Sequence, residues 1–137
     1  MDFIVWNDTY SLNVANINEQ HKELFELINN FYRGVDKSIN KKTLSKVLAE
    51  FLNYTKYHFS TEETFLHKHD YPYYEEHKLV HDKFIMEIVD FQKAFNNDDI
   101  QPTLELLKFI KNWLISHIFI MDKQYSTYFQ ENDMIPG

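Results

Sequence analysis

The sequence predicts an all-α fold, an antiparallel up-down-up-down four-helix bundle preceded by an extended N-terminal arm. The chain of 137 residues contains only two glycines and three prolines, too few for a protein of many short strands and turns. Apolar residues also recur at helical spacing in four long segments, at about residues 17–35, 41–67, 73–95 and 102–120. A single domain spanning residues 1–137 is the expected organisation at this length.

The first 15 residues or so form the expected arm, because their apolar side chains alternate only loosely. We expect this arm to lie against the bundle and shield apolar surface. Asn16 or Asn18 is the expected cap of the first helix, since an asparagine oxygen accepts hydrogen bonds from the free N–H groups of a first turn. Gly34 and Asp36-Lys37-Ser38 are expected to close that helix.

The second helix is expected to be capped by Asn40 or Ser38 and carries one anomaly on its apolar stripe. Glu62 stands where the helical pattern requires a core residue. A buried carboxylate without a partner is strongly unfavourable or gives up its charge. Glu62 therefore needs a partner inside the bundle.

The remaining helices follow two breaks in the chain. Asp70-Tyr71-Pro72 interrupts the pattern, because the residue before a proline resists helical geometry, and the third helix is expected from Pro72 or soon after. Pro102 is expected to open the fourth helix, which should end near residue 120.

Histidines lie on the apolar stripe of every predicted helix. They are His21, His58, His77, His81 and His117. His58 with Glu62, and His77 with His81, are spaced i, i+4, so each pair points from one face of its helix. In an antiparallel bundle all of these side chains fall near one end. One such histidine is usually an ordinary core residue, but five together with a glutamate favour a shared metal centre.

The mixture of ligands limits the metal. Five imidazoles and one carboxylate are too many for one tetrahedral zinc ion and too rich in nitrogen for calcium or magnesium. Two six-coordinate transition-metal ions would use them all, together with a second carboxylate, for which Asp122 is the candidate. On an ideal α-helix Asp122 lies about 140° from His117. It reaches the site only if the helix ends or forms a π-type distortion between Ile118 and Met121, and a surface aspartate is the open alternative.

Bulk composition excludes several classes of function. The 14 basic and 21 acidic residues give a net charge of −7, which argues against nucleic acid or an anionic membrane as a partner. The absence of cysteine excludes disulfides, thiolate metal sites and thiol catalysis. The N-terminus does not have the pattern of a secretory signal, and no apolar run approaches the roughly 18 residues of a membrane span. We therefore expect a soluble, cytoplasmic protein.

Four segments that carry these residues, and the dipeptide between the second and third helices, resemble the hemerythrin family, specifically its bacterial hemerythrin-like members. They are QHKELF at 20–25, YHFSTEE at 57–63, YP at 71–72, HKLVHDKF at 77–84 and WLISHIFIMD at 113–122. The resemblance extends from Trp6 to about Phe129. It implies that two non-haem iron ions, joined by an oxo or hydroxo bridge, are bound by His21, His58, Glu62, His77, His81, His117 and Asp122.

The resemblance also implies a role for each ligand. His77, His81 and His117 would hold a six-coordinate iron, His21 and His58 an iron with one open position, and Glu62 and Asp122 would bridge the two. The implied function is reversible binding of dioxygen, in a carrier, a store or a delivery protein that is not an enzyme and whose protein partner is unknown. The alternatives are a di-iron enzyme (an oxidase, a peroxidase or a nitric oxide reductase) and a sensor of oxygen or iron.

Apolar side chains near the predicted site are expected to exclude water from bound oxygen. The candidates for this oxygen pocket are Leu24, Phe25, Phe59, Trp113 and Leu114. Leu114, one turn before His117, is the candidate for contact with the oxygen, and the alternative is an ordinary core leucine. His67 and His69 match no ligand position and are expected at the surface. The sequence does not identify the partners of the ligand imidazoles.

Overall fold

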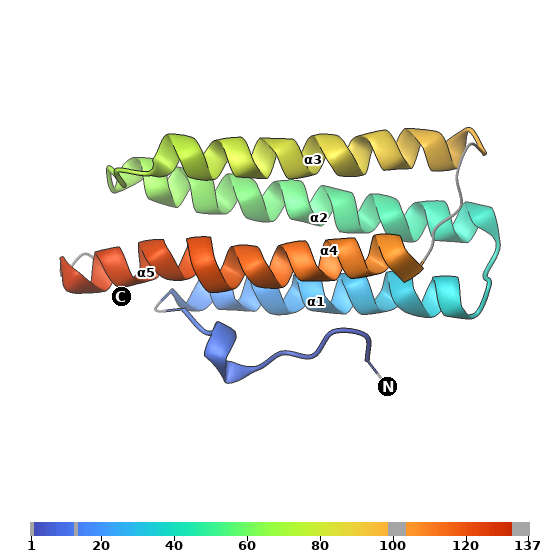
Figure 1. Cartoon of the computed structure of the whole chain (residues 1–137), viewed down its shortest axis with the longest axis horizontal. Coiled ribbons are helices and arrows are strands. Elements are labelled where there is room, and N and C mark those ends of the chain that lie inside the picture. The colour runs from blue at the N-terminus through green and yellow to red at the C-terminus, as the bar shows by residue number, and fades with distance from the viewer. Residues whose placement is uncertain (1, 13, 99–103, 133–137) are drawn as a thin grey trace.

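The computed structural model describes residues 2–12, 14–98 and 104–132 as an antiparallel four-helix bundle (Figure 1). Its helices are α1 (Ala15–Asp36), α2 (Lys41–Lys68), α3 (Tyr74–Asn96) and α4 (Leu104–Ser116). The last helix continues through the π-helical segment η2 (His117–Asp122) into α5 (Lys123–Glu131). The predicted fold class is confirmed. Among these described helices, none has both the length and the apolar character needed to cross a membrane.

The N-terminal arm runs along the bundle and includes a short 3-10 helix, η1 (Asp8–Tyr10) (Figure 1). Two asparagines of α1 hold it. The buried side chain of Asn29 accepts a hydrogen bond from the N–H of Ile4 and donates one to its C=O, both at 2.9 Å. Asn18 binds the N–H and C=O of Leu12 in the same way, at 2.7 and 2.8 Å.

Helix α1 differs from the prediction in its N-cap and in the role of Gly34, whereas its end at Asp36 agrees with the expected close at Asp36-Lys37-Ser38. Its N-cap is Val14, without a side-chain cap, so the expected capping by Asn16 or Asn18 was wrong. Asn18 instead uses its amide to hold the arm. Gly34 lies inside α1 and does not end it; a Cβ there would stand 2.8 Å from the Cδ1 of Ile39, so glycine allows the following turn to pass close to the helix.

The starts of the next helices follow local signals. Asn40 caps α2 by accepting a hydrogen bond from the N–H of Thr43 at 2.9 Å, as one of the two expected caps. At the following turn Asp70 adopts a positive φ of 54°, and α3 begins at Tyr74, two residues after Pro72. The predicted start of the fourth helix at Pro102 lies outside the described residues.

Two apolar clusters form the core, and the predicted ligands lie between them along the helices. On α1, Ile17 of the smaller cluster and Leu24 of the larger one flank His21. The smaller cluster also contains Tyr125 and Phe129, both fully buried. The expected end of the last helix near residue 120 was therefore wrong. Helical structure continues to Glu131, because α5 supplies side chains that close this end of the bundle.

Candidate metal centre

One group of donor atoms comes from α2, α3 and η2. It consists of Glu62, His77, His81, His117 and Asp122, whose donor atoms all lie within 4.8 Å of one another. The Nε2 of His77 is 2.8 Å from Glu62 Oε1 and 3.1 Å from Asp122 Oδ1. The Nε2 of His81 is 3.1 Å from the same glutamate oxygen and 2.9 Å from His117 Nε2. Every member is buried.

A second group lies beside the first and shares both carboxylates with it. Its members are His21, His58, Glu62 and Asp122. The Nε2 of His21 lies 3.2 Å from Asp122 Oδ2 and 3.8 Å from Glu62 Oε2, and the Nε2 of His58 lies 3.6 Å from Glu62 Oε2. The structure thus brings together all seven residues that the sequence singled out as ligands.

The two carboxylates are divided between the groups atom by atom. Oε1 of Glu62 and Oδ1 of Asp122 face the histidines of α3 and η2. Oε2 of Glu62 and Oδ2 of Asp122 face the histidines of α1 and α2. A carboxylate in this arrangement can give one oxygen to each of two neighbouring metal ions.

Asp122 reaches this position because the last helix changes its winding. Residues His117–Asp122 form a π-helix, so the condition that the sequence set for Asp122 is met by a distortion and not by an end of the helix. A π-helix pairs residues i and i+5, so it brings two side chains five residues apart onto one face. His117 Nε2 and Asp122 Oδ1 are accordingly 3.2 Å apart.

The distances in the first group suit a six-coordinate ion. Bonds of about 2.1 Å place neighbouring donors of an octahedron about 3.0 Å apart and opposite donors about 4.2 Å apart. The closest donor pairs measure 2.8 to 3.2 Å, while His117 Nε2 and Glu62 Oε1 are 3.9 Å apart, as for donors on opposite sides. Three nitrogens and two oxygens would fill five positions. The second group offers two nitrogens and two oxygens.

Unpaired buried atoms also point to a bound cation. Both carboxylate oxygens of Asp122 and the Nε2 of His21 are buried without a hydrogen bond to any described residue. They lie close together, but not in hydrogen-bonding alignment. Buried polar atoms in folded proteins are normally paired, and a charged pair left without hydrogen bonds is costly. A metal ion bound by both residues would satisfy them.

The charges inside the site favour ionised carboxylates. Burial raises the pKa of a carboxyl group, but at Glu62 the surrounding imidazoles, first that of His117, outweigh burial and hold the pKa well below its usual value. At Asp122 burial and the neighbouring Glu62 raise the pKa, but the histidines again prevail and lower it. Burial lowers the pKa of His58 to about 3, so this imidazole is neutral. At His21 and His77 burial also acts to lower the pKa, but Asp122 and Glu62 outweigh it and raise the pKa to about 9 and about 10. A metal ion that binds these two imidazoles would therefore displace their protons.

Three residues that the sequence reasoning missed contact the site. Gln20 Oε1 lies 2.8 Å from His58 Nδ1, and Glu63 Oε2 lies 2.8 Å from His81 Nδ1. The buried hydroxyl of Tyr125 donates a hydrogen bond to Glu62 Oε2 at 2.9 Å. The spacing of Tyr125, three residues after Asp122, was a signal for it, because helical residues at i and i+3 share a face. Gln20 and Glu63 are sequence neighbours of ligands and point to other helices.

Of the five expected oxygen-pocket residues, Phe59 and Trp113 contact histidines of the site. Leu24 and Leu114 are buried in the larger core cluster. Phe59 stacks on His81 at 3.7 Å between ring centroids, and Phe25 packs against Trp6 and Tyr10 of the arm. Trp113 stacks on His117 at 4.6 Å, so its contact is with the first group of donors.

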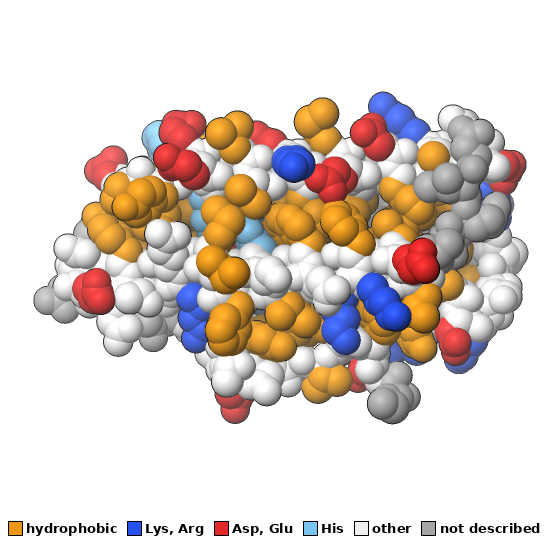
Figure 2. All heavy atoms as spheres, in the orientation of Figure 1, with side chains coloured by type: hydrophobic (Ala, Val, Ile, Leu, Met, Phe, Trp, Pro, Cys, Tyr) orange, Lys and Arg blue, Asp and Glu red, His pale blue; other side chains and the backbone are white. Residues whose placement is uncertain are grey.

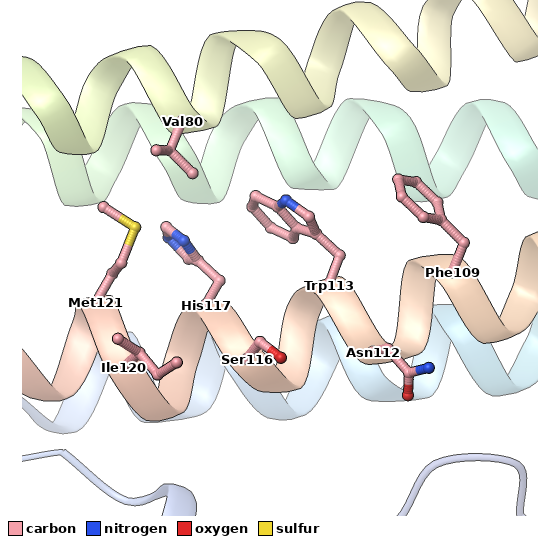
Figure 3. A pocket seen from close by; sticks show the side chains of 8 residues that line it. All are labelled: Val80, Phe109, Asn112, Trp113, Ser116, His117, Ile120 and Met121. Carbon is pink, nitrogen blue, oxygen red and sulfur yellow. The ribbon is translucent and has the colours of Figure 1, made fainter.

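Trp113 also lines an apolar groove between α3 and the last helix. The groove has a volume of about 580 Å³, and His117 forms part of its wall. The side chains of Trp113, His117 and Phe109 point towards α3 across it (Figure 3). Figure 2 shows hydrophobic side chains gathered on this face, with histidine visible among them.

The two remaining histidines lie outside both groups of donors. His67 is exposed, as expected. His69 is half-buried against Phe65 and Phe129, so its expected place at the surface was only partly right. The cause is the continuation of the last helix, which brings Phe129 to this end of the bundle.

Comparison with known proteins gives a consistent result. Residues 12–129 match the model of the family described as the Hemerythrin HHE cation binding domain. Bacteriohemerythrin of Clostridium acetobutylicum is 31% identical over 125 residues, which cover 88% of this chain and 97% of that protein. Bacteriohemerythrin of Methylococcus capsulatus is 29% identical over 126 residues, 91% of this chain and 95% of that protein. A crystal structure of wild-type hemerythrin superposes with a TM-score of 0.86 at 28% identity, covering 91% of this chain and 96% of that one.

Proposed function

This chain belongs to the hemerythrin family, and we propose that it binds dioxygen reversibly at a pair of iron ions. The family is one of iron-containing, oxygen-binding proteins rather than enzymes. Our proposal adds the number of ions, their ligands and the role of the chain as an oxygen carrier or store. The ligands are His21, His58, Glu62, His77, His81, His117 and Asp122.

The division of the two carboxylates is the observation that carries this proposal. Each offers one oxygen to each group of histidines, as a bridge between two ions requires. With one hydroxide shared by both ions, the ion at His77, His81 and His117 would have six ligands. The ion at His21 and His58 would have five, which leaves one position for a small molecule. Two carboxylates and a hydroxide also offset three of the four positive charges of a diferrous pair, so the centre suits an apolar bundle.

A ferrous pair supplies dioxygen with two electrons, one from each ion, and the protein has to keep the exchange reversible. Leu24, Phe59 and Leu114 are buried in the larger core cluster, and in our proposal they exclude water from the bound oxygen. The Nδ1 atoms of His58 and His81 donate to oxygen atoms of other helices, which leaves the Nε2 lone pairs free for metal. The ligands are thereby held in one orientation.

Metal analysis combined with an anaerobic oxygen titration tests the proposal. We expect two irons per chain and, when air reaches the diferrous protein, a visible charge-transfer absorption that disappears on deoxygenation. Direct and irreversible conversion to the diferric form would contradict reversible binding. Steady turnover of hydrogen peroxide or nitric oxide by the isolated protein would favour a di-iron enzyme instead.

A further inference from the structure

The two groups of metal ligands have hydrogen-bond partners of different charge. The Nδ1 of His81 faces the carboxylate of Glu63, and the Nδ1 of His58 faces the amide oxygen of Gln20, both at 2.8 Å. Both acceptors are oxygen atoms without a proton to donate, so both imidazoles carry the hydrogen on Nδ1. The rings are thus held alike, but only the ring of His81 has a negative charge behind it.

Tyr125 adds to this difference from the side of the bridging glutamate. Its hydroxyl donates a hydrogen bond to Oε2 of Glu62, the oxygen that faces His21 and His58. Tyr125 is fully buried, and the carboxylate oxygen can only accept, so the hydroxyl is the donor of this hydrogen bond. A hydrogen bond of this kind draws electron density from Oε2. Oε1 faces His77 and His81, and among the described residues no tyrosine hydroxyl donates to it.

We propose that Glu63, Gln20 and Tyr125 make the two iron positions unequal, so that the ion at His77, His81 and His117 loses its electron first. A carboxylate behind a ligand imidazole raises the basicity of the ligand, which stabilises the more highly charged ferric ion. A neutral amide and a hydrogen bond to the shared carboxylate leave the other ion poorer in electron density. This inference rests on the proposed function, because it requires two iron ions in one chain.

The order of oxidation is a property of two separate one-electron steps. In each step one ferrous ion becomes ferric and one ferricyanide becomes ferrocyanide, and no bond of the chain is formed or broken. The first step would oxidise the ion held by His77, His81 and His117 and leave it bound. The protein should therefore accumulate a half-oxidised form before the second step begins.

Single substitutions separate the charge of these partners from their hydrogen bonds. Glu63→Gln keeps an oxygen acceptor for His81 but removes the charge, and it should raise the potential of the first step. Gln20→Glu adds a charge behind His58 and should lower the potential of the second. Both changes bring the two steps together. Asp82→Asn is the matched control, because Asp82 follows His81 in sequence and pairs with Lys78 at the surface instead of with a ligand.

The experiment is an anaerobic spectroelectrochemical titration of the iron-loaded proteins, after iron content has been measured. We expect Glu63→Gln to lower the maximum amount of the half-oxidised form. The comproportionation constant, for formation of this form from the diferrous and diferric forms, should fall by roughly tenfold or more, comparable to the roughly tenfold lower limit seen in metal affinity or activity when a hydrogen-bond partner of a ligand is lost. Tyr125→Phe should act in the same direction. Asp82→Asn should leave both steps in place.

Several results would overturn the inference. They are unchanged potentials in Glu63→Gln, a shift of the second step alone in that variant, or an equal effect of Asp82→Asn. Because Glu63 is partly exposed, its substitution tests the order of oxidation even if the more buried Gln20→Glu fails to load iron. A chain that binds two irons and shows the expected shifts, but does not bind oxygen reversibly, would contradict the proposed function and leave this inference standing.

Discussion

At the scale of single residues, Glu62 shows how one side chain links the sequence pattern to the site. It occupies a core position on α2, is fully buried and lies within 4 Å of five histidine nitrogens. A carboxylate is tolerated there only because positive charge surrounds it. Its two oxygens also face different histidines, so it acts on both halves of the proposed centre.

The first prediction concerns the charge of this glutamate. Glu62→Gln keeps the shape of the side chain but cannot neutralise or bridge two cations, so we expect iron content to fall from two to less than one per chain. Elemental analysis of the purified protein measures it. Glu50→Gln, an exposed change on the same helix, should retain both ions. Full iron loading of Glu62→Gln would contradict the assignment of Glu62 as a bridge.

The second prediction separates the oxygen pocket from ordinary core packing. Leu114→Ala should cost about 2–5 kcal/mol of unfolding free energy and also let water reach the site, so the oxygen-bound spectrum should decay faster. Ile110, one turn earlier on α4 and equally buried, provides the control. Ile110→Ala should cost similar stability without faster decay. Equal decay rates in the two variants would identify Leu114 as a core leucine only.

At the scale of elements, η2 and the arm are the two departures from a plain bundle. The π-helical turn carries Asp122 onto the face of His117 and still lets α5 continue the helix. The arm is held along α1 by side-chain amides that pair with its backbone. Each departure therefore has a definite structural effect that a change in the chain can test.

The third prediction concerns the number of residues in η2. Deleting the exposed Ile120 leaves His117 and Asp122 four positions apart, about 40° on an α-helix, so iron binding should survive. Inserting an alanine after Ile120 adds about 100° of rotation, and should remove Asp122 from the site and Tyr125 from the core. Iron content and circular dichroism measure both outcomes. Loss of iron binding on deletion of Ile120 would contradict this prediction. It would show that the π-helix itself is required, and not only the placement of Asp122 on the same face as His117.

The fourth prediction concerns the arm. Asn29→Ala leaves the buried N–H and C=O of Ile4 without their partner, and should cost about 1–3 kcal/mol in urea unfolding. The neighbouring Asn30 is exposed, so Asn30→Ala should change stability far less. An equally small effect at both positions would show that the arm contributes little to the folded state.

At the scale of the whole molecule, the proposed metal centre is built into the fold. The seven proposed ligands come from α1, α2, α3 and η2, and all are buried between the two core clusters. Without a cation these helices bring buried carboxylates and imidazoles together with several atoms unpaired. Metal binding should therefore stabilise the bundle as a unit.

The fifth prediction follows from this coupling. Removing iron with a chelator should lower the midpoint of thermal unfolding, since a ligand at 1,000 times its Kd stabilises a protein by about 4 kcal/mol. Circular dichroism with and without iron measures the shift. Glu62→Gln, which should not hold the ions, should unfold at the same temperature in both conditions. Equal midpoints for the iron-loaded and iron-free native chain would show that the bundle folds independently of its metal.

The sequence by itself determined the fold class, narrowed the cap of α2 to Asn40 or Ser38, and indicated six of the seven residues that converge; Asp122 was added by the family resemblance. Helical periodicity and i, i+4 spacing are local properties, so they can be recognised without any partner segment. Even the π-helical distortion followed from a local condition, the five-residue step from His117 to Asp122.

Only the tertiary structure decided which side chains support the site. The pairs Gln20–His58, Glu63–His81 and Glu62–Tyr125 join residues 38, 18 and 63 positions apart. The arm contact between Ile4 and Asn29 spans 25 positions. Such contacts depend on the rotation and height of one helix against another, and the hydrophobic pattern of a single helix does not specify either.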